Sequence, residues 1–253
     1  MPTYRISFQL YSARDKAPIE TQLEALAAIG YDAVEPYGAN FLADAKGLRS
    51  KADALGLTIP TAHMPLAELD RDRSHAIDMA KTLGLETVVL PHVAPPERPT
   101  TTDGWKAFAN RLGAHAGALK TAGLRLAWHN HDFEYGKLPD GSRPIDHLLA
   151  VEGVLFEADL AWIVRAGADI AAEIARYSSK VAAFHIKDTA PAGVTKDDGW
   201  TDVGAGIIDW VKLWPTIGKT GANLLIMEND KPSDWRSFAA NSYKYVSGLT
   251  GRN

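Results

Sequence analysis

Pairs of ionisable residues spaced two apart recur in the second half of this sequence, each at the end of an apolar segment. The pairs are His129 and His131, Glu157 and Asp159, His185 and Lys187, and Glu228 and Asp230. Residues two apart on a β-strand point to the same face, so both members of a pair lie on one side of the strand. Carboxylates brought together repel, and a divalent cation relieves that repulsion. We therefore expect Asp159, His185 and Glu228 to form a metal site with nitrogen and oxygen ligands.

Other polar residues at predicted strand ends have simpler explanations when each is taken alone. His63 or His92 by itself is more often a hydrogen-bonded structural residue than a ligand. Glu35 could equally form a salt bridge with a neighbouring strand. Asp188 and Asp230 could start the following turn or helix, which is a common role of Asp at such positions. The metal site is therefore predicted from the joint pattern and not from any one residue.

The elements that must position these side chains alternate along the whole chain. Strands are predicted at 5–11, 33–37, 57–63, 87–92, 125–131, 154–159, 181–187 and 223–228. Helical spacing is found at 19–29, 47–55, 73–83, 105–122, 169–177, 208–217 and 235–249, and more weakly at 145–150. Glycines at helix ends before the next strand are typical of left-handed C-caps; these are Gly30, Gly56, Gly84 and Gly123.

Regular alternation of strands and helices predicts a parallel sheet. Eight units in 253 residues predict an α/β protein with a single (β/α)₈ TIM barrel over residues 1–253. An open doubly wound sheet is the rival. No Gly-rich phosphate loop follows the first strand, where residues 9–14 read QLYSAR, and this argues against the rival.

The composition narrows the kinds of partner and compartment. The chain has no cysteine, which excludes disulfides and thiolate ligands. A net charge of −4 gives no general attraction to nucleic acid or anionic membranes, so we expect neither as a partner. No signal-peptide pattern or membrane-length apolar run is present, and we expect a cytoplasmic protein. A homo-oligomer is possible.

At these residues the chain resembles the sugar phosphate isomerase/epimerase-like superfamily of xylose isomerase-like barrels. The matching segments are GYDAVE at 30–35, WHNHDFE at 128–134, DLAW at 159–162, HIKD at 185–188, VGAGIIDW at 203–210 and MEND at 227–230. The resemblance runs nearly end to end, and it specifies no substrate. It implies an enzyme that holds one divalent ion at the C-terminal mouth of the barrel.

The resemblance also implies which residues bind that ion. Asp159, His185 and Glu228 stand at three of the four ligand positions. At the fourth, where many relatives have Glu, this chain has His129. Strand parity favours His129 as the ligand, and Glu134 reaching back to the ion is the alternative. The ion would be Mn²⁺, Zn²⁺, Co²⁺, Fe²⁺ or Mg²⁺, and the sequence does not choose among them.

Such a site suits proton abstraction next to a carbonyl, with the metal stabilising the enediolate. Our candidates for acid–base work are His131, Glu134 and Glu157. Lys187 could stabilise an oxyanion or simply be solvated. The residues expected to bind substrate are Glu35, His63, His92 and Trp162.

The leading functional prediction is a metal-dependent isomerase or epimerase of a sugar or keto-sugar. An unphosphorylated carbohydrate is preferred because no Arg/Lys cluster stands at the strand ends. The alternative is a dehydratase or lyase that acts by β-elimination on an inosose or 3-keto-glycoside. A phosphodiesterase of the endonuclease IV kind is less favoured because of the net charge, and a non-catalytic sugar-binding barrel is a further alternative. The irregular segment 190–205 is expected to form a lid or part of the pocket.

Overall fold

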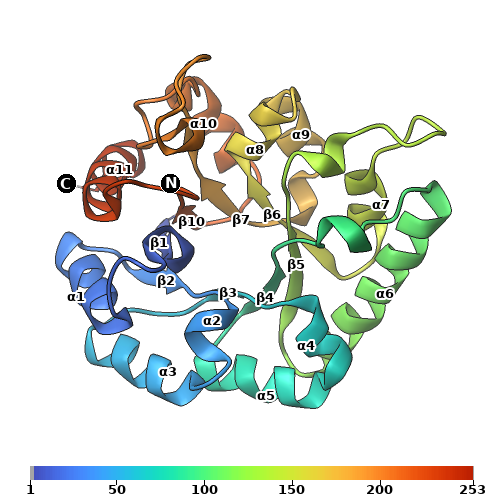
Figure 1. Ribbon diagram of the computed structural model, residues 1–253, viewed down its shortest axis with the longest axis horizontal. Coiled ribbons are helices and arrows are strands. Elements are labelled where there is room, and N and C mark those ends of the chain that lie inside the picture. The colour runs from blue at the N-terminus through green and yellow to red at the C-terminus, as the bar shows by residue number, and fades with distance from the viewer. Residues whose placement is uncertain (1–2, 253) are drawn as a thin grey trace.

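Eight parallel strands surround the centre of the molecule in the computed structural model, which describes residues 3–252 (Figure 1). The strands are β1 (Arg5–Gln9), β2 (Ala33–Glu35), β3 (Thr61–His63), β4 (Thr87–Leu90), β5 (Arg125–His129), β6 (Val154–Asp159), β7 (Val181–Ile186) and β10 (Leu224–Met227). Their order in the sheet is β2-β1-β10-β7-β6-β5-β4-β3. The predicted TIM barrel is confirmed.

The barrel closes between β2 and β3 through isolated bridges. One bridge pairs Ala33 with Thr58, and the other pairs Tyr37 with His63. The His63 amide donates to the Pro36 carbonyl at 2.9 Å. The strand predicted at 57–63 is reduced to β3 because Pro60 has no N–H to contribute to a ladder.

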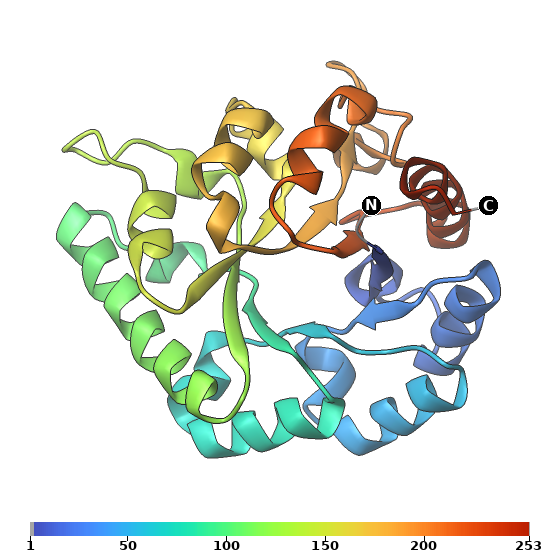
Figure 2. The ribbon, with the colours of Figure 1, turned by 180° about the vertical axis from the view of Figure 1, so that it is seen from behind.

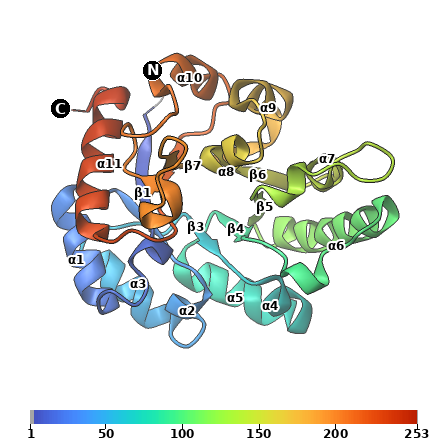
Figure 3. The ribbon, with the colours of Figure 1, turned by 45° about the horizontal axis from the view of Figure 1, so that its top comes forward.

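Helices form an outer ring around the strands, which is also visible from behind (Figure 2). They are α1 (Ile19–Ile29), α2 (Gly38–Phe41), α3 (Ala45–Ala54), α4 (Leu66–Arg71), α5 (Arg73–Leu83), α6 (Thr102–Thr121), α7 (Pro144–Ala150), α8 (Leu160–Arg165), α9 (Ile170–Arg176), α10 (Trp210–Gly218) and α11 (Trp235–Thr250). The last helix, α11, packs beside the first, α1, which completes the outer ring (Figure 3).

Local signals explain where several helices begin and end. Side chains of Asp72 and Thr101 accept hydrogen bonds from the first turns of α5 and α6. Gly30 and Gly84 end α1 and α5 in the left-handed conformation, with φ of 112° and 77°, as predicted. A Cβ at Gly30 would also lie 2.8 Å from the Tyr243 hydroxyl, so only glycine fits this joint.

Alternation along the strands separates an apolar outer layer from a polar barrel interior. Phe8, on β1, points outward and contacts Tyr31 and Phe238. A small separate apolar cluster consists of Ala183, Leu224 and Ile226. Many of the other inward-facing side chains are polar, among them Ser7, Gln9, Thr61 and Thr87, whereas barrel interiors are normally packed with branched apolar residues.

A short hairpin occupies the segment that was predicted to be irregular. Strands β8 (Asp188–Thr189) and β9 (Trp200–Thr201) pair antiparallel. The Asp188 carboxylate accepts hydrogen bonds from four backbone amides and the Trp210 indole; the amides are those of Thr189, Gly204, Gly206 and Ile208. This carboxylate therefore fixes the path of the loop after β7. No helix among residues 3–252 is long and apolar enough to cross a membrane.

Candidate metal centre

Ionisable side chains from six strands meet at the C-terminal end of the barrel. Those buried to at least nine-tenths are Glu35, His63, His129, Glu157, Asp159, His185, Lys187 and Glu228. Sheet register places His129 level with Glu157, and Asp159 level with His185. The inward faces of neighbouring strands thus bring carboxylates and imidazoles into contact.

Two overlapping groups of four residues could each hold a metal ion. The outer group is His129, Asp159, His185 and Glu228, and the inner group is His63, His129, Glu157 and His185. Within each group, one ligand atom from every residue lies within 4.8 Å of the others. Glu157 precedes Asp159 by two residues on β6, so the inner group lies one layer further from the mouth of the barrel.

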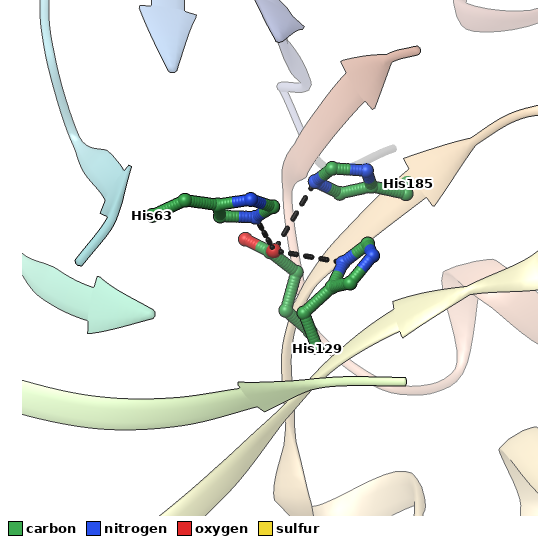
Figure 4. Close-up of side chains that lie close together, drawn as sticks. His63, His129 and His185 are labelled. Carbon is green, nitrogen blue, oxygen red and sulfur yellow. Dashed lines mark hydrogen bonds and ion pairs between the residues drawn. The ribbon is translucent and has the colours of Figure 1, made fainter. Parts of the chain in front are cut away.

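The inner group is organised around one carboxylate oxygen. Figure 4 shows His63, His129 and His185 converging on this oxygen, Oε2 of Glu157. It lies 2.8 Å from His63 Nε2, 3.2 Å from His129 Nδ1 and 3.1 Å from His185 Nε2. Burial alone would raise the pKa of Glu157, but the three histidines hold it well below its usual range. An ionised carboxylate only accepts hydrogen bonds, so it favours protons on the ring nitrogens that face it.

The opposite ring nitrogens face the outer group. In His185, Nδ1 is the nitrogen that faces the outer group, and it lies 3.1 Å from Glu228 Oε2. Its other nitrogen, Nε2, lies 2.8 Å from Glu35 Oε2. His129 Nε2 lies 3.9 Å from Asp159 Oδ2. Burial lowers the pKa of His129 to about 3, so this ring is neutral and can keep a lone pair on Nε2, whereas an ion bound to His185 Nδ1 would replace the proton that faces Glu228. A carboxylate behind a ligating histidine is the usual arrangement at metal sites.

The outer group meets the chemical requirements of a divalent ion. Asp159 Oδ1 accepts from the Trp162 amide at 2.9 Å, whereas its buried Oδ2 has no hydrogen-bond partner. Burial raises the pKa of Asp159 to about 6, against the opposing effects of Lys187 and His185. Two imidazole nitrogens and two carboxylate oxygens form a donor set that suits zinc and similar ions.

His185 is one of two histidines that belong to both groups, and its surroundings shift its pKa. Burial disfavours the charged form of His185, but Glu157, Glu228 and Glu35 outweigh it and raise its pKa well above the ordinary value. An imidazole flanked by three carboxylates is stabilised by added positive charge, which either a proton or a metal ion supplies.

Lys187 is completely buried beside the outer group. Its Nζ lies 2.6 Å from Asp230 Oδ1, 3.5 Å from Glu228 Oε2 and 3.7 Å from Asp159 Oδ2. The ring of Trp200, on β9, covers the ammonium at 3.9 Å. The alternative in which Lys187 is solvated is therefore wrong, and the segment that was predicted to form a lid or part of the pocket encloses this lysine.

A cavity of about 500 Å³ opens above the outer group. Its polar wall consists of His63, His92, His129, His131, Glu228 and Asp230. Burial, together with His129 and Lys187, keeps the pKa of His131 well below its ordinary value. A neutral His131 therefore faces the space in which a small molecule would lie.

The family model for xylose isomerase-like TIM barrels matches residues 23–244 of the chain. The chain belongs to the xylose isomerase-like TIM barrel family. Among curated protein sequences, none is significantly similar to this family member.

Solved structures of low identity share the barrel. A sugar phosphate isomerase/epimerase from Parabacteroides distasonis is 19% identical, with a TM-score of 0.83 over 97% of this chain and 94% of that one. The IolI protein, with a binding zinc atom, is 14% identical, with a TM-score of 0.79 over 98% of each chain. AsbF from Bacillus anthracis, a probable 3-DHS dehydratase, is 10% identical, with a TM-score of 0.75 over 96% of this chain and 98% of that one. At these identities the likeness shows the fold alone.

Within the xylose isomerase-like barrel, the four predicted ligands are the residues that form the outer group. Glu134 does not join them. Its oxygens accept from Trp128 Nε1 at 3.0 Å and the His131 amide at 2.8 Å, and it does not line the cavity. Burial raises the pKa of Glu134 to about 8. The structure therefore does not bring Glu134 to the other predicted ligands, and its enclosed position does not favour the predicted acid–base role.

Of the residues predicted for catalysis or substrate binding, three besides Glu134 and Lys187 do not line the cavity. Glu35 and Glu157 are fully buried beneath the outer group, so neither fits its predicted role in substrate binding or proton transfer. Trp162 packs against His131 and Trp200, with ring centroids at 5.1 and 4.9 Å. His63, His92 and His131 do line the cavity, as their predicted roles require.

One supporting residue was not singled out from the sequence. Gln9 ends β1 opposite Glu35 in the sheet register, and its Nε2 donates to Glu35 Oε2 at 2.7 Å. The sequence pattern that could have identified Gln9 is a polar residue at the end of a predicted strand, the position at which the other strands carry their functional groups.

Proposed function

We propose that the chain is a divalent-metal-dependent isomerase or epimerase that acts on an unphosphorylated sugar or keto-sugar. The observation that carries the proposal is the outer group, in which two imidazoles and two carboxylates converge below a cavity. The similarity in fold to a sugar phosphate isomerase/epimerase and to the zinc-binding IolI protein supports it.

The outer group would hold the ion, and the ion would act as a Lewis acid toward a substrate oxygen. His131 is the candidate base, because it lines the cavity and burial lowers its pKa, which keeps the imidazole neutral. The Lys187 ammonium lies beside two of the ligand carboxylates and favours negative charge that develops on the substrate. Asp230 anchors Lys187 and reaches the cavity wall.

The charges at the cavity favour a neutral substrate. Among residues 3–252, those that line the cavity include Glu228 and Asp230 but neither Lys nor Arg. Apart from the proposed ion, a phosphate group placed there would meet two carboxylates and no cationic side chain on the cavity wall. This supports an unphosphorylated carbohydrate and argues against a phosphodiester substrate.

The alternative function is β-elimination from an inosose or 3-keto-glycoside by the same residues. A cavity of about 500 Å³ is larger than one sugar ring fills, which suits a substrate that carries a second group. An enolate formed next to a carbonyl would then expel water or an aglycone instead of being reprotonated.

Incubating metal-loaded protein with a panel of sugars, keto-sugars and keto-glycosides in D₂O tests both functions. We expect deuterium at the carbon next to the carbonyl, with isomerised or epimerised product. Release of water or an aglycone would identify the lyase instead. A panel without exchange or turnover would reject both.

Substitutions test the assigned site separately from turnover. Asp159→Ala and His185→Ala should abolish metal retention while the fold survives. His115→Ala is the matched control, since His115 is a buried histidine that contacts Asp70 on the outer ring. Full metal content in either site variant, measured by mass spectrometry, would remove the assigned site.

A further inference from the structure

One wall of the cavity is apolar. It is formed by Tyr11, Tyr37, Leu42, Pro65 and Pro91, which follow β1 to β4 in the chain. In the sheet order, β1 lies across the barrel from β5, at whose end His129 and His131 of the polar wall stand, whereas His63 and His92 lie beside Pro65 and Pro91. The cavity is therefore apolar near β1 and β2 and polar near β5.

The apolar wall leaves large side chains exposed to solvent. Tyr11 is 36% exposed and Leu42 is 38% exposed, whereas most large apolar side chains of the described residues are buried. Apolar surface at the mouth of a cavity is stabilised when a ligand removes it from water. The wall thus has the properties of a contact surface for an apolar group.

The wall is packed in advance of any ligand. The rings of Tyr11 and Tyr37 meet edge to face at 5.3 Å and 89°. The Arg14 guanidinium lies 3.7 Å from the centroid of the Tyr11 ring and covers one of its faces. A Cβ at Gly38 would lie 3.2 Å from both Leu42 and Pro65, so the glycine lets these parts of the wall approach closely. A preformed wall loses little entropy when it binds.

The wall's chemistry selects the group that fits it. Its side chains offer only the two tyrosine hydroxyls for hydrogen bonding. A second sugar ring would lose hydrogen bonds to water there and regain few of them, whereas an aryl or alkyl group has none to lose. The carboxylates on the polar side disfavour an anionic group.

We propose that the cavity binds a glycoside, with the sugar over the outer group and a neutral aryl or alkyl aglycone against Tyr11, Tyr37 and Leu42. The placement of the sugar rests on the proposed function. The placement of the aglycone rests on the apolar wall.

The test compares methyl and phenyl glycosides of the common hexoses, with the disaccharide cellobiose, by calorimetry on the metal-loaded full chain. We expect a phenyl glycoside to bind roughly tenfold to a hundredfold tighter than its methyl counterpart. Leu42→Asn should reduce that preference several-fold, because it weakens the binding of phenyl glycosides more than that of methyl glycosides. Leu55→Asn is the matched control, because Leu55 is 36% exposed and does not line the cavity.

Equal binding of every methyl and phenyl pair, or binding of neither, would overturn the proposal. If cellobiose binds as tightly as the phenyl glycosides, the apolar wall contacts a second sugar and not an apolar aglycone. An equal effect of Leu55→Asn would show that the wall is not the contact. Because binding requires no turnover, the two proposals can fail separately. A phenyl preference without hydrogen exchange in D₂O would support the aglycone site and reject the proposed reaction. Exchange without a phenyl preference would support the reaction and reject the aglycone site.

Discussion

Glu157→Gln removes the charge at the centre of the three imidazoles while it preserves the size of the side chain. We expect the outer group to keep all four ligands but to bind metal more weakly. The amide oxygen is a weaker acceptor for His129 and His185 than the carboxylate. If the amide NH₂ faces a ring nitrogen instead, that nitrogen must be unprotonated to accept its hydrogen bond. The ring orientations that leave lone pairs for the ion would no longer be favoured.

The magnitude follows from the distance between the carboxylate and the ion. Glu157 Oε2 lies 3.2 Å from His129 Nδ1. An ion bonded at about 2 Å to Nε2 of that ring would lie roughly 6–7 Å from the oxygen. A unit charge and a dication at that separation interact by about 1 kcal/mol in water and about 5 kcal/mol at an effective dielectric of 20. Changes behind ligating histidines typically weaken binding by about 10–100-fold, or roughly 1.4–2.7 kcal/mol, and we expect that range here.

The assay is a competition titration of chelator-treated protein with Zn²⁺ and Mn²⁺ against a coloured chelator. Circular dichroism and thermal unfolding check the fold of each variant. Glu173→Gln is the matched control, since Glu173 is a buried glutamate whose carboxylate pairs with Arg143 at 2.8 Å. It should lower the unfolding temperature and leave metal affinity unchanged. Metal affinity of Glu157→Gln within about threefold of the wild type, or an equal loss in the control, would refute the reasoning.

Three further changes test other parts of the structure. Lys187→Met removes a positive charge 3.7 Å from Asp159. Metal affinity should stay equal or rise, while kcat falls at least about a hundredfold. A loss of metal would contradict this expectation. The folded-state pKa of Glu134, about 8, exceeds its unfolded value, so wild-type stability should fall by up to a few kcal/mol as pH rises from about 5 to 9. Thermal unfolding of Glu134→Gln across that range should lack this slope, and an unchanged slope would reject Glu134 as its source. Asp188→Ala leaves five donors without their acceptor and should lower the unfolding temperature and speed proteolysis after β7; resistance equal to the wild type would argue against that role.

Strand parity is enough to predict which side chains gather, but not how deep each one lies. Glu157 and Asp159 share a face of β6, so the sequence groups them together. Their roles differ because one lies level with His129 and the other level with His185, and this register depends on the neighbouring strands. Depth in a barrel is a property of the closed sheet, which no single segment specifies.

Two other features depend on contacts that local patterns do not contain. Glu134 follows β5 in a 3-10 turn (Phe133–Tyr135), which directs its carboxylate to Trp128 on the outward face of the strand. Lys187 is buried because Trp200, far along the chain, folds back over it as part of the β8–β9 hairpin. The alternation of strands and helices, in contrast, follows from local spacing and glycine caps, and it predicts the barrel correctly.

The seam between β2 and β3 has a consequence for the cavity above it. Isolated bridges join these strands within residues 3–252, while the neighbouring pairs share continuous ladders. Tyr37 and Pro65 stand on the two sides of this seam, and both belong to the apolar wall. A molecule that contacts both residues would stabilise the barrel at the place where neighbouring strands share the fewest hydrogen bonds. Ligand binding and closure of the barrel at this seam are then thermodynamically linked, so each favours the other.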